Sequence, residues 1–336
     1  MREALPLIAA FGTALLLGWV MRRAGIIDRP NQRSNHDRPT PRGGGLGILA
    51  GFFLALALLP EQSPASGAML AGLAVCGGIA GLTGLLDDWF TLSETPKFII
   101  LAVISLALAA VAGPVLEFGV ALPWLIGLAG TGLWVFTTAN AVNFMDGSDG
   151  LILACLIPAC LVLGLAGGGD VGPASLALAA ALAGFAVWNA PLLHPRGTLF
   201  AGDAGALGAS VLFAGLALRW AATGPDGTVW LAALLILPLL GDVLLTMAAR
   251  ARAGRRLFAP HRAHAYQLLI RTGSSHRRVA AMWAGLSLVC GALVLIGAAG
   301  PAGLKLAVFV IGVAGFTVFH RIVRQRAAAA GEDITQ

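Results

Sequence analysis

The chain has 336 residues, of which 58% are hydrophobic and 11% are charged, and its mean hydropathy is +0.85. These values exclude an ordinary soluble domain, in which about a quarter of the residues are charged. The formal net charge is +6, but no basic face with aromatic or groove-reading elements accompanies it, so we expect no nucleic-acid partner.

Eleven apolar runs of about 20 residues are long enough to cross roughly 30 Å of hydrocarbon. Together they use nearly the whole chain, so residues 1–336 are predicted to form one polytopic, all-α integral membrane domain. In chain order, the predicted spans are 4–21, 43–60, 67–85, 97–113, 123–139, 150–166, 175–190, 204–221, 228–248, 279–298 and 303–320.

The first apolar run resembles a signal peptide only in its position. Its basic pair, Arg22–Arg23, follows the apolar run, whereas a cleavable signal carries its positive charge in front. We therefore expect this run to remain in the protein as a membrane helix.

Arginine and lysine gather in alternate loops, and this asymmetry predicts the orientation, because basic residues collect on the cytoplasmic side. With the N-terminus outside, 19 of the 22 basic residues lie in inward loops or at their borders, and the C-terminus is cytoplasmic. The inward segments include a predicted substrate-recognition loop at 249–278 and a tail at 321–336. The protein is therefore expected to lie in a membrane with its basic loops on the cytoplasmic side.

All dense polar clusters of the sequence fall in these same inward loops, which predicts one cytoplasmic site assembled from several loops. The outward loops hold only scattered charges. The clusters are Ser34-Asn35-His36 through Pro39-Thr40-Pro41-Arg42-Gly43-Gly44-Gly45, then Asp87-Asp88, then Asn140-Ala141-Val142-Asn143-Phe144-Met145-Asp146-Gly147-Ser148-Asp149-Gly150, then Gly202-Asp203, and His261-Arg262-Ala263-His264.

Five aspartates, each at a predicted helix end, belong to these clusters. Crowded carboxylates repel one another unless some take up protons or a cation binds. Mg²⁺ suits such a site, because it takes one or two protein oxygens and keeps waters and substrate phosphates. Lys97, Arg42 and Arg262 supply the opposite charge that phosphate oxygens require. Acids, a metal and basic clamps together indicate phosphoryl transfer.

The order of these motifs resembles the polyprenyl-phosphate N-acetylhexosamine-1-phosphate transferases of glycosyltransferase family 4. The likeness covers about residues 34–278, and five motifs in series are specific although each alone is weak. The forms Pro-Arg-Gly-Gly-Gly and His-Arg-Ala-His-Ala-Tyr resemble most closely the bacterial branch that initiates O-antigen or related surface glycans.

The resemblance implies a reaction in which undecaprenyl phosphate attacks a UDP-N-acetylhexosamine, giving undecaprenyl-diphosphate-sugar and UMP. Mg²⁺ is the implied cofactor, with Mn²⁺ as an alternative. Relatives often dimerise, so a homodimer is also an expectation. The implied catalytic residues are Asp87, Asp88 and Asp146, with Asp87 as the preferred base, and the implied metal ligands are Asn143 and Asp203.

The remaining site residues are assigned to substrate binding. Lys97 stands out because the chain has only two lysines among its 22 basic residues. The full set of predicted substrate contacts is Lys97, Asn140, Asp149, His261, Arg262, His264 and Arg42.

Several of these residues have a structural alternative. Asp149 precedes a predicted span and is suited to cap its N-terminus. His261 and His264 have the spacing of a zinc pair, but no third soft ligand is evident. The run 43–45 is typical of close helix packing as well as of phosphate binding. For Asp242 the sequence leaves two roles open, a part in the site or an ion pair with Arg250 or Arg252.

Two other functions are alternatives for a membrane protein with these acids. A secondary transporter also carries membrane acids, but it should show polar residues near mid-span, broken helices and inverted repeats. A CDP-alcohol phosphotransferase would need its own spaced aspartate signature, which the sequence lacks.

Overall fold

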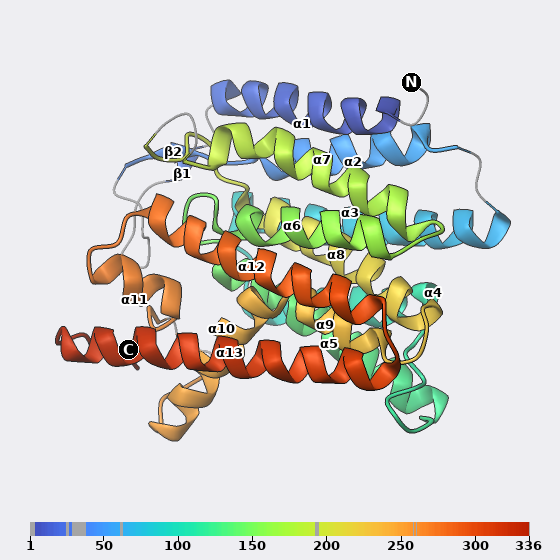
Figure 1. Cartoon of the computed structure of the whole chain (residues 1–336). Coiled ribbons are helices and arrows are strands. Elements are labelled where there is room, and N and C mark those ends of the chain that lie inside the picture. Colours follow the sequence, from blue (N-terminus) through green and yellow to red (C-terminus); the bar gives the residue numbers. More distant parts are fainter. Residues whose placement is uncertain are drawn as a thin grey trace.

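The computed structural model describes residues 4–24, 27–28, 38–60, 63–191, 195–257, 259 and 261–335. This part of the chain is a helical bundle with one two-stranded antiparallel ribbon, which confirms the predicted all-α class (Figure 1). Its elements are α1 Ala4–Ala24, β1 Ile27–Asp28, β2 Thr40–Pro41, α2 Gly45–Leu58, α3 Pro64–Phe90, α4 Glu94–Ala112, α5 Trp124–Met145, α6 Leu151–Ala166, α7 Val171–Asn189, α8 Gly202–Thr223, α9 Thr228–Leu235, α10 Leu237–Arg252, α11 Ala265–Arg271, α12 His276–Ala298 and α13 Ala302–Ala329.

Eight of the described helices are long and apolar enough to cross a membrane, and α9 with α10 makes a ninth if the bent pair is one span. The runs at 43–60 and 150–166 give shorter helices than we expected. With 14 and 16 residues, α2 and α6 extend only about 21–24 Å at 1.5 Å per residue. That is less than the roughly 30 Å of a bilayer core.

The outer helices expose large apolar side chains, as a protein with lipid as its solvent requires. Ile8 on α1 is 66% exposed, Leu133 on α5 is 64% exposed and Leu165 on α6 is 73% exposed. Because such exposure is unfavourable in water and natural against lipid tails, the protein is a multi-pass membrane protein.

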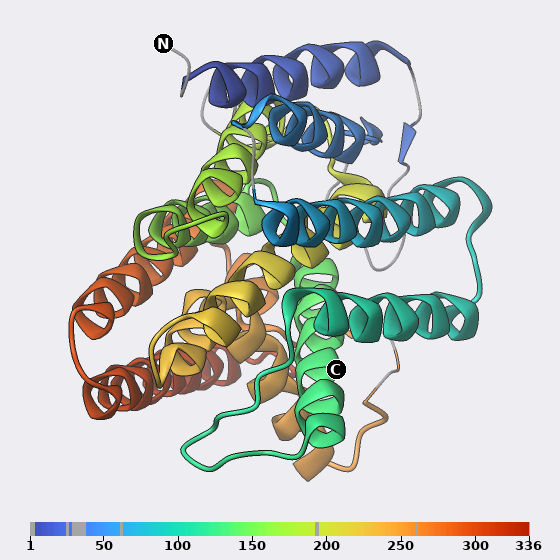
Figure 2. The same ribbon diagram turned by 90° about the vertical axis from the view of Figure 1, so that its right-hand side faces the viewer.

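Helix α8 forms the centre of the bundle and is buried along almost its whole length. Its small residues let neighbouring helices approach, a common feature of membrane helix packing. A Cβ on Gly208 would lie 2.8 Å from the Leu49 side chain, and one on Gly215 would lie 2.5 Å from that of Leu73. In both views α1 and α13 lie at opposite edges of the bundle (Figures 1 and 2).

The predicted span at 228–248 is divided into two helices, because the chain bends by 79° between α9 and α10. The bend falls at Ile236, two residues before Pro238, whose missing N–H and ring favour a break in a helix. The Pro238 carbonyl accepts a hydrogen bond from Trp283 Nε1 at 3.1 Å, so its backbone acceptor stays satisfied. The bend directs α10 towards the end of the bundle that carries α11.

The β1–β2 ribbon and α11 lie at the same end of the bundle, on the left of Figure 1, while the described N-terminal end lies at the other. Arg219 and Lys305, two of the three basic residues outside the predicted inward loops, each lie close to a group of opposite charge or a backbone acceptor. Arg219 lies 3.7 Å from the Asp170 carboxylate, and Lys305 Nζ donates to the Asp226 carbonyl at 2.8 Å.

The two predicted inward segments contain more regular structure than expected. Segment 249–278 includes the end of α10, the short helix α11 and the start of α12. In the predicted tail, α13 continues to Ala329 before the chain turns back. Both segments therefore extend the helical bundle beyond the apolar spans.

Candidate active site

Asp87 and Asp88 lie near the C-terminal end of α3, and different partners hold them. Asp87 Oδ1 accepts a hydrogen bond from the Leu92 N–H at 2.7 Å, and Oδ2 accepts one from Lys97 Nζ at 2.8 Å. Asp88 is 7% exposed, and its Oδ1 lies 3.3 Å from Arg42 Nη1. Arg42 also donates to the Asp88 backbone carbonyl. Each carboxylate thus has its own cation, which lets two adjacent acids remain ordered at a helix end.

The start of α8 meets the end of α3, and this contact brings Asp203 to the acidic pair. The carboxyl groups of Asp87 and Asp203 interact directly. Gly202 has a φ of +70°, and a Cβ there would lie 2.5 Å from Asp88 Oδ2. Glycine is therefore required at 202 for both its backbone angle and its space. The Ala204 N–H faces Asp88 Oδ2 at 3.5 Å, which places a carboxylate at a helix N-terminus.

The segment 40–45 supports α8 from its other side. The Phe200 N–H donates to the Pro41 carbonyl at 2.8 Å, and the Gly45 N–H donates to the Ala201 carbonyl at 2.9 Å. A Cβ on Gly45 would lie 2.1 Å from the backbone nitrogen of Gly205. Of the two interpretations of the triple glycine, the structure therefore supports close helix packing. The predicted cluster 34–36 lies outside the described residues.

Asp146 follows the last residue of α5 and faces the acids of α3 and α8. Burial, and then the negative charges of Asp203 and Asp88, raise the pKa of Asp146 well above its ordinary value. A carboxylate among carboxylates gains a proton or a cation more readily than an isolated one. This crowding is the electrostatic signature expected of a cation site.

Asp149 binds a neighbouring loop and does not cap a helix. Its Oδ2 accepts a hydrogen bond from the Gly197 N–H at 3.0 Å. Helix α6 has no side-chain cap, and its N-cap position is Gly150, whose N–H donates to Asn189 Oδ1 at 2.9 Å. The loop 146–150 is thereby fixed against the 195–201 segment, so the capping alternative for Asp149 is wrong.

The segment 261–267 presents two histidines side by side, with ring centroids 4.8 Å apart. Nδ1 of His261 accepts a hydrogen bond from the Ala263 N–H at 3.3 Å, so the neutral ring carries its proton on Nε2. Burial, and then the positive charges of His264 and Arg250, lower the pKa of His261 to about 4. At neutral pH His261 is therefore an uncharged hydrogen-bond donor.

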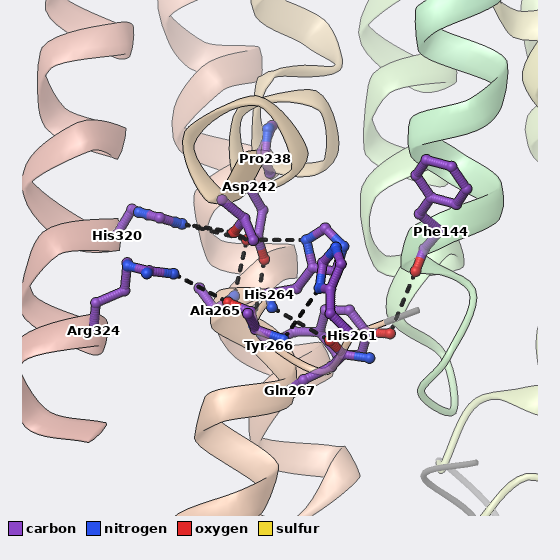
Figure 3. A network of polar contacts seen from close by, with 12 residues as sticks. Phe144, Pro238, Asp242, His261, His264, Ala265, Tyr266, Gln267, His320 and Arg324 are labelled. Carbon is purple, nitrogen blue, oxygen red and sulfur yellow. Dashed lines mark hydrogen bonds and ion pairs between the residues drawn. The ribbon is translucent and has the colours of Figure 1, made fainter. Parts of the chain in front are cut away.

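A buried carboxylate on α10, Asp242, holds this histidine segment in place (Figure 3). It accepts hydrogen bonds from the backbone N–H groups of Ala265 at 2.8 Å and Tyr266 at 3.3 Å. The imidazoles of His320 and His264 lie 3.4 and 3.7 Å from its Oδ1. Asp242 therefore caps α11 and connects it to α10 and α13.

The expected alternative for Asp242, an ion pair with Arg250 or Arg252, is wrong. Arg250 donates to the backbone carbonyls of Thr335 and Arg256. The bend at Ile236 turns Asp242 towards α11, which sequence spacing along one straight helix could not show.

The described C-terminal residues fold back and secure the same segment. Arg324 donates to the Ala263 carbonyl at 3.1 Å and to the Ile334 carbonyl at 2.7 Å. Arg271 forms an ion pair with Glu332. Arginines from α11 and α13 thus join the C-terminal residues to the histidine segment.

These elements enclose a cavity of about 700 Å³, a size typical of small-molecule sites. Asp87, Lys97, Asn140 and Arg262 are not among its lining residues. The predicted site residues that do line it are Arg42, Asp88, Asn143, Asp146, Asp149, Asp203, His261 and His264.

Lys97 and Asn140 line a smaller adjoining crevice of about 30 Å³. Asn143 and Phe144 border both spaces. The other walls of the crevice are mostly apolar and include Ile100, Leu101 and Ile104. Among the predicted substrate-binding residues, these two therefore form a separate group next to the cavity.

Some lining residues carry no prediction from the sequence. Two of them have a signal in the sequence that could have indicated a site residue. Asn189 is a lone amide at the end of an apolar run, and Tyr266 is the only tyrosine in the chain. His276 is the first residue of α12. In the sequence it falls in the arginine-rich predicted loop 249–278, where nothing distinguishes it as a site residue. The polar lining residues to which the sequence analysis assigned no individual role include Ser148, Asn189, Tyr266, Gln267 and His276.

Within the described ranges, no group of three or more His, Cys, Asp or Glu side chains is arranged to hold a metal ion. This excludes a preformed cage of such side chains there.

Comparison with known proteins places this site in a family. The model of glycosyl transferase family 4 matches residues 70–221. The chain is 33% identical over 322 residues to the decaprenyl-phosphate N-acetylglucosaminephosphotransferase of Mycobacterium leprae, covering 83% of this chain and 79% of that protein.

Two relatives from other bacteria carry a related name, undecaprenyl-phosphate alpha-N-acetylglucosaminyl 1-phosphate transferase. The Yersinia pestis protein is 29% identical over 311 residues, covering 86% of this chain and 82% of its own length. The Escherichia coli K12 protein is 28% identical over 275 residues, covering 77% and 73%. The acidic cavity at one end of a membrane bundle and these likenesses agree, and the chain belongs to the polyprenyl-phosphate N-acetylglucosamine-1-phosphate transferase family.

Proposed function

We propose that the protein transfers an N-acetylhexosamine 1-phosphate from a UDP-sugar to undecaprenyl phosphate, releasing UMP and forming undecaprenyl-diphosphate-sugar. One observation carries the proposal. Acids from α3, α8 and the end of α5 share a cavity with Arg42 and three histidines, in a chain whose relatives are named for this type of transfer.

The donor diphosphate belongs in the cavity, between the acids and the basic groups. Asp203 and Asn143, with Asp146 beside them, are the residues that would hold Mg²⁺, or Mn²⁺ in its place. When bound, such a cation neutralises diphosphate charge. Arg42 is already ordered by Asp88, and His261 offers an Nε2–H donor to substrate oxygens.

The lipid phosphate is proposed to bind at Lys97, beside the crevice. Its Nζ is a compact charge suited to a phosphate, while Ile100, Leu101 and Ile104 offer an apolar wall to an isoprenoid chain. Two carboxylates contact Lys97 Nζ, Asp87 at 2.8 Å and Glu94 at 3.4 Å, and Asp87 is the closer and more buried of the two. We assign it the role of orienting that phosphate and accepting its proton where one is present.

UDP-N-acetylglucosamine is the first donor to test, because the relatives' names specify N-acetylglucosamine. We further propose that the product starts O-antigen or another cell-surface polysaccharide. In this proposal the protein lies in the bacterial inner membrane, with the active site and the C-terminus on the cytoplasmic face and the N-terminus outside.

The structure has one of the features expected of a transporter, the broken span α9–α10. In a transporter such a break lines a substrate site near mid-membrane. Here the acidic residue after the break, Asp242, is buried and bonded to the backbone of α11. The break serves the loop at the bundle end, so a specific observation in favour of transport is lacking.

The test uses purified protein with undecaprenyl phosphate, MgCl₂ and a panel of UDP-GlcNAc, UDP-GalNAc, UDP-FucNAc and UDP-QuiNAc. Release of UMP and the mass of the lipid product are followed together. We expect lipid-dependent release of UMP with at least one donor. The variant Glu117→Gln, which removes a charge in the α4–α5 loop away from the cavity, should be as active as the wild type. Absence of lipid-dependent UMP with every donor would overturn the proposal.

A further inference from the structure

His276, the first residue of α12, lines the cavity and is anchored through one ring nitrogen. Its Nδ1 lies 2.9 Å from Ser148 Oγ and 3.4 Å from the backbone nitrogen of Asp149. A backbone N–H can only donate, so Nδ1 is the acceptor and the neutral ring carries its proton on Nε2. The Ser148 hydroxyl then donates to Nδ1 as well.

The Nε2–H group of His276 makes no hydrogen bond within the described part of the chain, although the other ring nitrogen has two partners. The ring is partly exposed and borders the cavity. An ordered donor that is held from behind and has no protein acceptor in front is arranged to bind a ligand oxygen.

The surroundings of His276 favour an uncharged ligand group. Asp149 lies in the loop that holds the imidazole, and its carboxylate would repel a phosphate whose charge no cation neutralises. The cations Arg42 and Lys97 are held at Asp88 and Asp87. Arg277 and Arg278, which follow His276, are exposed and do not line the cavity. The sugar part of a sugar nucleotide suits this wall better than its diphosphate.

We propose that His276 Nε2–H donates a hydrogen bond to an uncharged oxygen of the hexosamine, a hydroxyl or the N-acetyl carbonyl, and so takes part in sugar recognition. The inference rests on the proposed function for the identity of the donor substrate. It assigns this residue a role beyond anchoring the 146–150 loop.

Two substitutions distinguish sugar binding from loop anchoring, because each retains the hydrogen-bonding group at only one of the two ring-nitrogen positions. In His276→Asn the amide replaces Nδ1 and can still bind Ser148 and the Asp149 N–H, but the donor at the Nε2 position is lost. In His276→Gln the amide nitrogen reaches the Nε2 position, whereas the anchor is lost. The dissociation constants of UDP-GlcNAc and UMP are measured by calorimetry in full-length protein with MgCl₂, together with the melting temperature.

We expect His276→Asn to melt near the wild-type temperature and to bind UDP-GlcNAc about tenfold more weakly, the effect of one lost hydrogen bond. Its affinity for UMP, which lacks the sugar, should stay within about twofold of wild type. His276→Gln should melt lower and keep its affinity for UDP-GlcNAc. In steady-state assays, the loss in His276→Asn should appear in KM for the UDP-sugar, with kcat little changed.

The opposite pattern would overturn the inference. Wild-type affinity in His276→Asn with weaker binding in His276→Gln would leave His276 as a loop anchor. An equal loss of UMP affinity would assign the contact to the phosphates or the nucleotide. If His276→Asn failed to fold, a tenfold loss in folded His276→Gln would be enough to reject the inference. Because calorimetry needs no turnover, failure of the proposed transfer reaction would be seen separately, as wild-type binding without lipid-dependent UMP.

Discussion

Gly84 of α3 lies directly against the backbone of Asp203 at the start of α8, so closely that a Cβ on Gly84 would be 2.3 Å from the Asp203 carbonyl carbon. This contact brings the acidic end of α3 to the acidic start of α8. The position of Asp203 beside Asp87 and Asp88 therefore requires that residue 84 has no side chain.

The close approach predicts that Gly84→Ala separates α3 from α8 and displaces Asp87 and Asp88. Misplacement of catalytic groups by about 1 Å can cost on the order of 100-fold in rate, so we expect UMP release to fall at least about tenfold. Gly78→Ala on the same helix is the matched control, because its Cβ would meet only the Phe53 ring at 3.7 Å. Equal activity of the two variants would contradict this account of the contact.

The assignment of Asp203 as a metal ligand predicts that Asp203→Ala abolishes turnover. Chelation with EDTA should do the same to the wild type, and added MgCl₂ should restore activity only there, since the variant lacks a principal carboxylate ligand. The measurement is UMP release before and after chelation. Wild-type turnover in Asp203→Ala, or activity that resists EDTA, would show that the assignment is incorrect.

The position of Asp242 predicts a loss of order in the histidine segment when its charge is removed. In Asp242→Asn, at most one of the two α11 amide hydrogen bonds keeps an acceptor, and bonds to a charged group contribute about 1.5–3 kcal/mol each. We expect faster hydrogen exchange at Ala265 or Tyr266 and about tenfold lower turnover.

Thr246→Val provides the comparison for Asp242. It removes a hydroxyl donor to the same carboxylate, at 3.1 Å, and leaves both backbone bonds in place. Exchange at residues 265–266 should therefore stay close to wild type in this variant. If exchange in Asp242→Asn matched that of Thr246→Val, the capping role would be disproved.

The crowding of acids predicts that Asp146 costs stability in metal-free protein. Its folded-state pKa is raised well above the ordinary value, first by burial and then by Asp203 and Asp88. The folded state therefore binds more protons than the unfolded state above about pH 4, and stability falls as the pH rises through this range.

Asp146→Asn should remove this cost. We expect a higher melting temperature than wild type at pH 7 in the presence of EDTA, a smaller difference near pH 4, and strongly reduced turnover. Thermal unfolding at several pH values measures the effect. A melting difference that did not change with pH would argue against titration of Asp146 as its source.

The environment of His261 predicts pH dependence of the opposite sign. Its pKa of about 4 lies below the roughly 6.5 of an unperturbed histidine, so the unfolded state binds the extra proton between these values. The contribution of His261 to stability therefore decreases as the pH falls from about 6.5 to about 4. His261→Gln should lose less melting temperature than wild type over this interval, and parallel curves would count against the stated cause.

Hydropathy was sufficient to predict the membrane class and the approximate positions of most helices. A run of apolar residues favours a helix in lipid whatever its neighbours are, because each helix satisfies its own backbone hydrogen bonds. The motifs likewise pointed to the acids and histidines that the cavity gathers, since polar residues are rare in such a chain. The same reasoning did not predict the break at Ile236 or the shortness of α2 and α6, which depend on packing.

By itself, the sequence determined the chemistry available to this protein, namely acids, amides, arginines and histidines gathered in particular loops between apolar helices. Only the tertiary structure decided how they are used. It placed Lys97 and Asn140 beside the main cavity, bound Asp149 to Gly197, turned Asp242 to cap α11, and brought His276 to the wall through Ser148. Linear spacing fixes which residues share a loop or a helix face. Contacts between helices are set by side-chain volume, glycine approach and bends, and these are properties of the whole bundle.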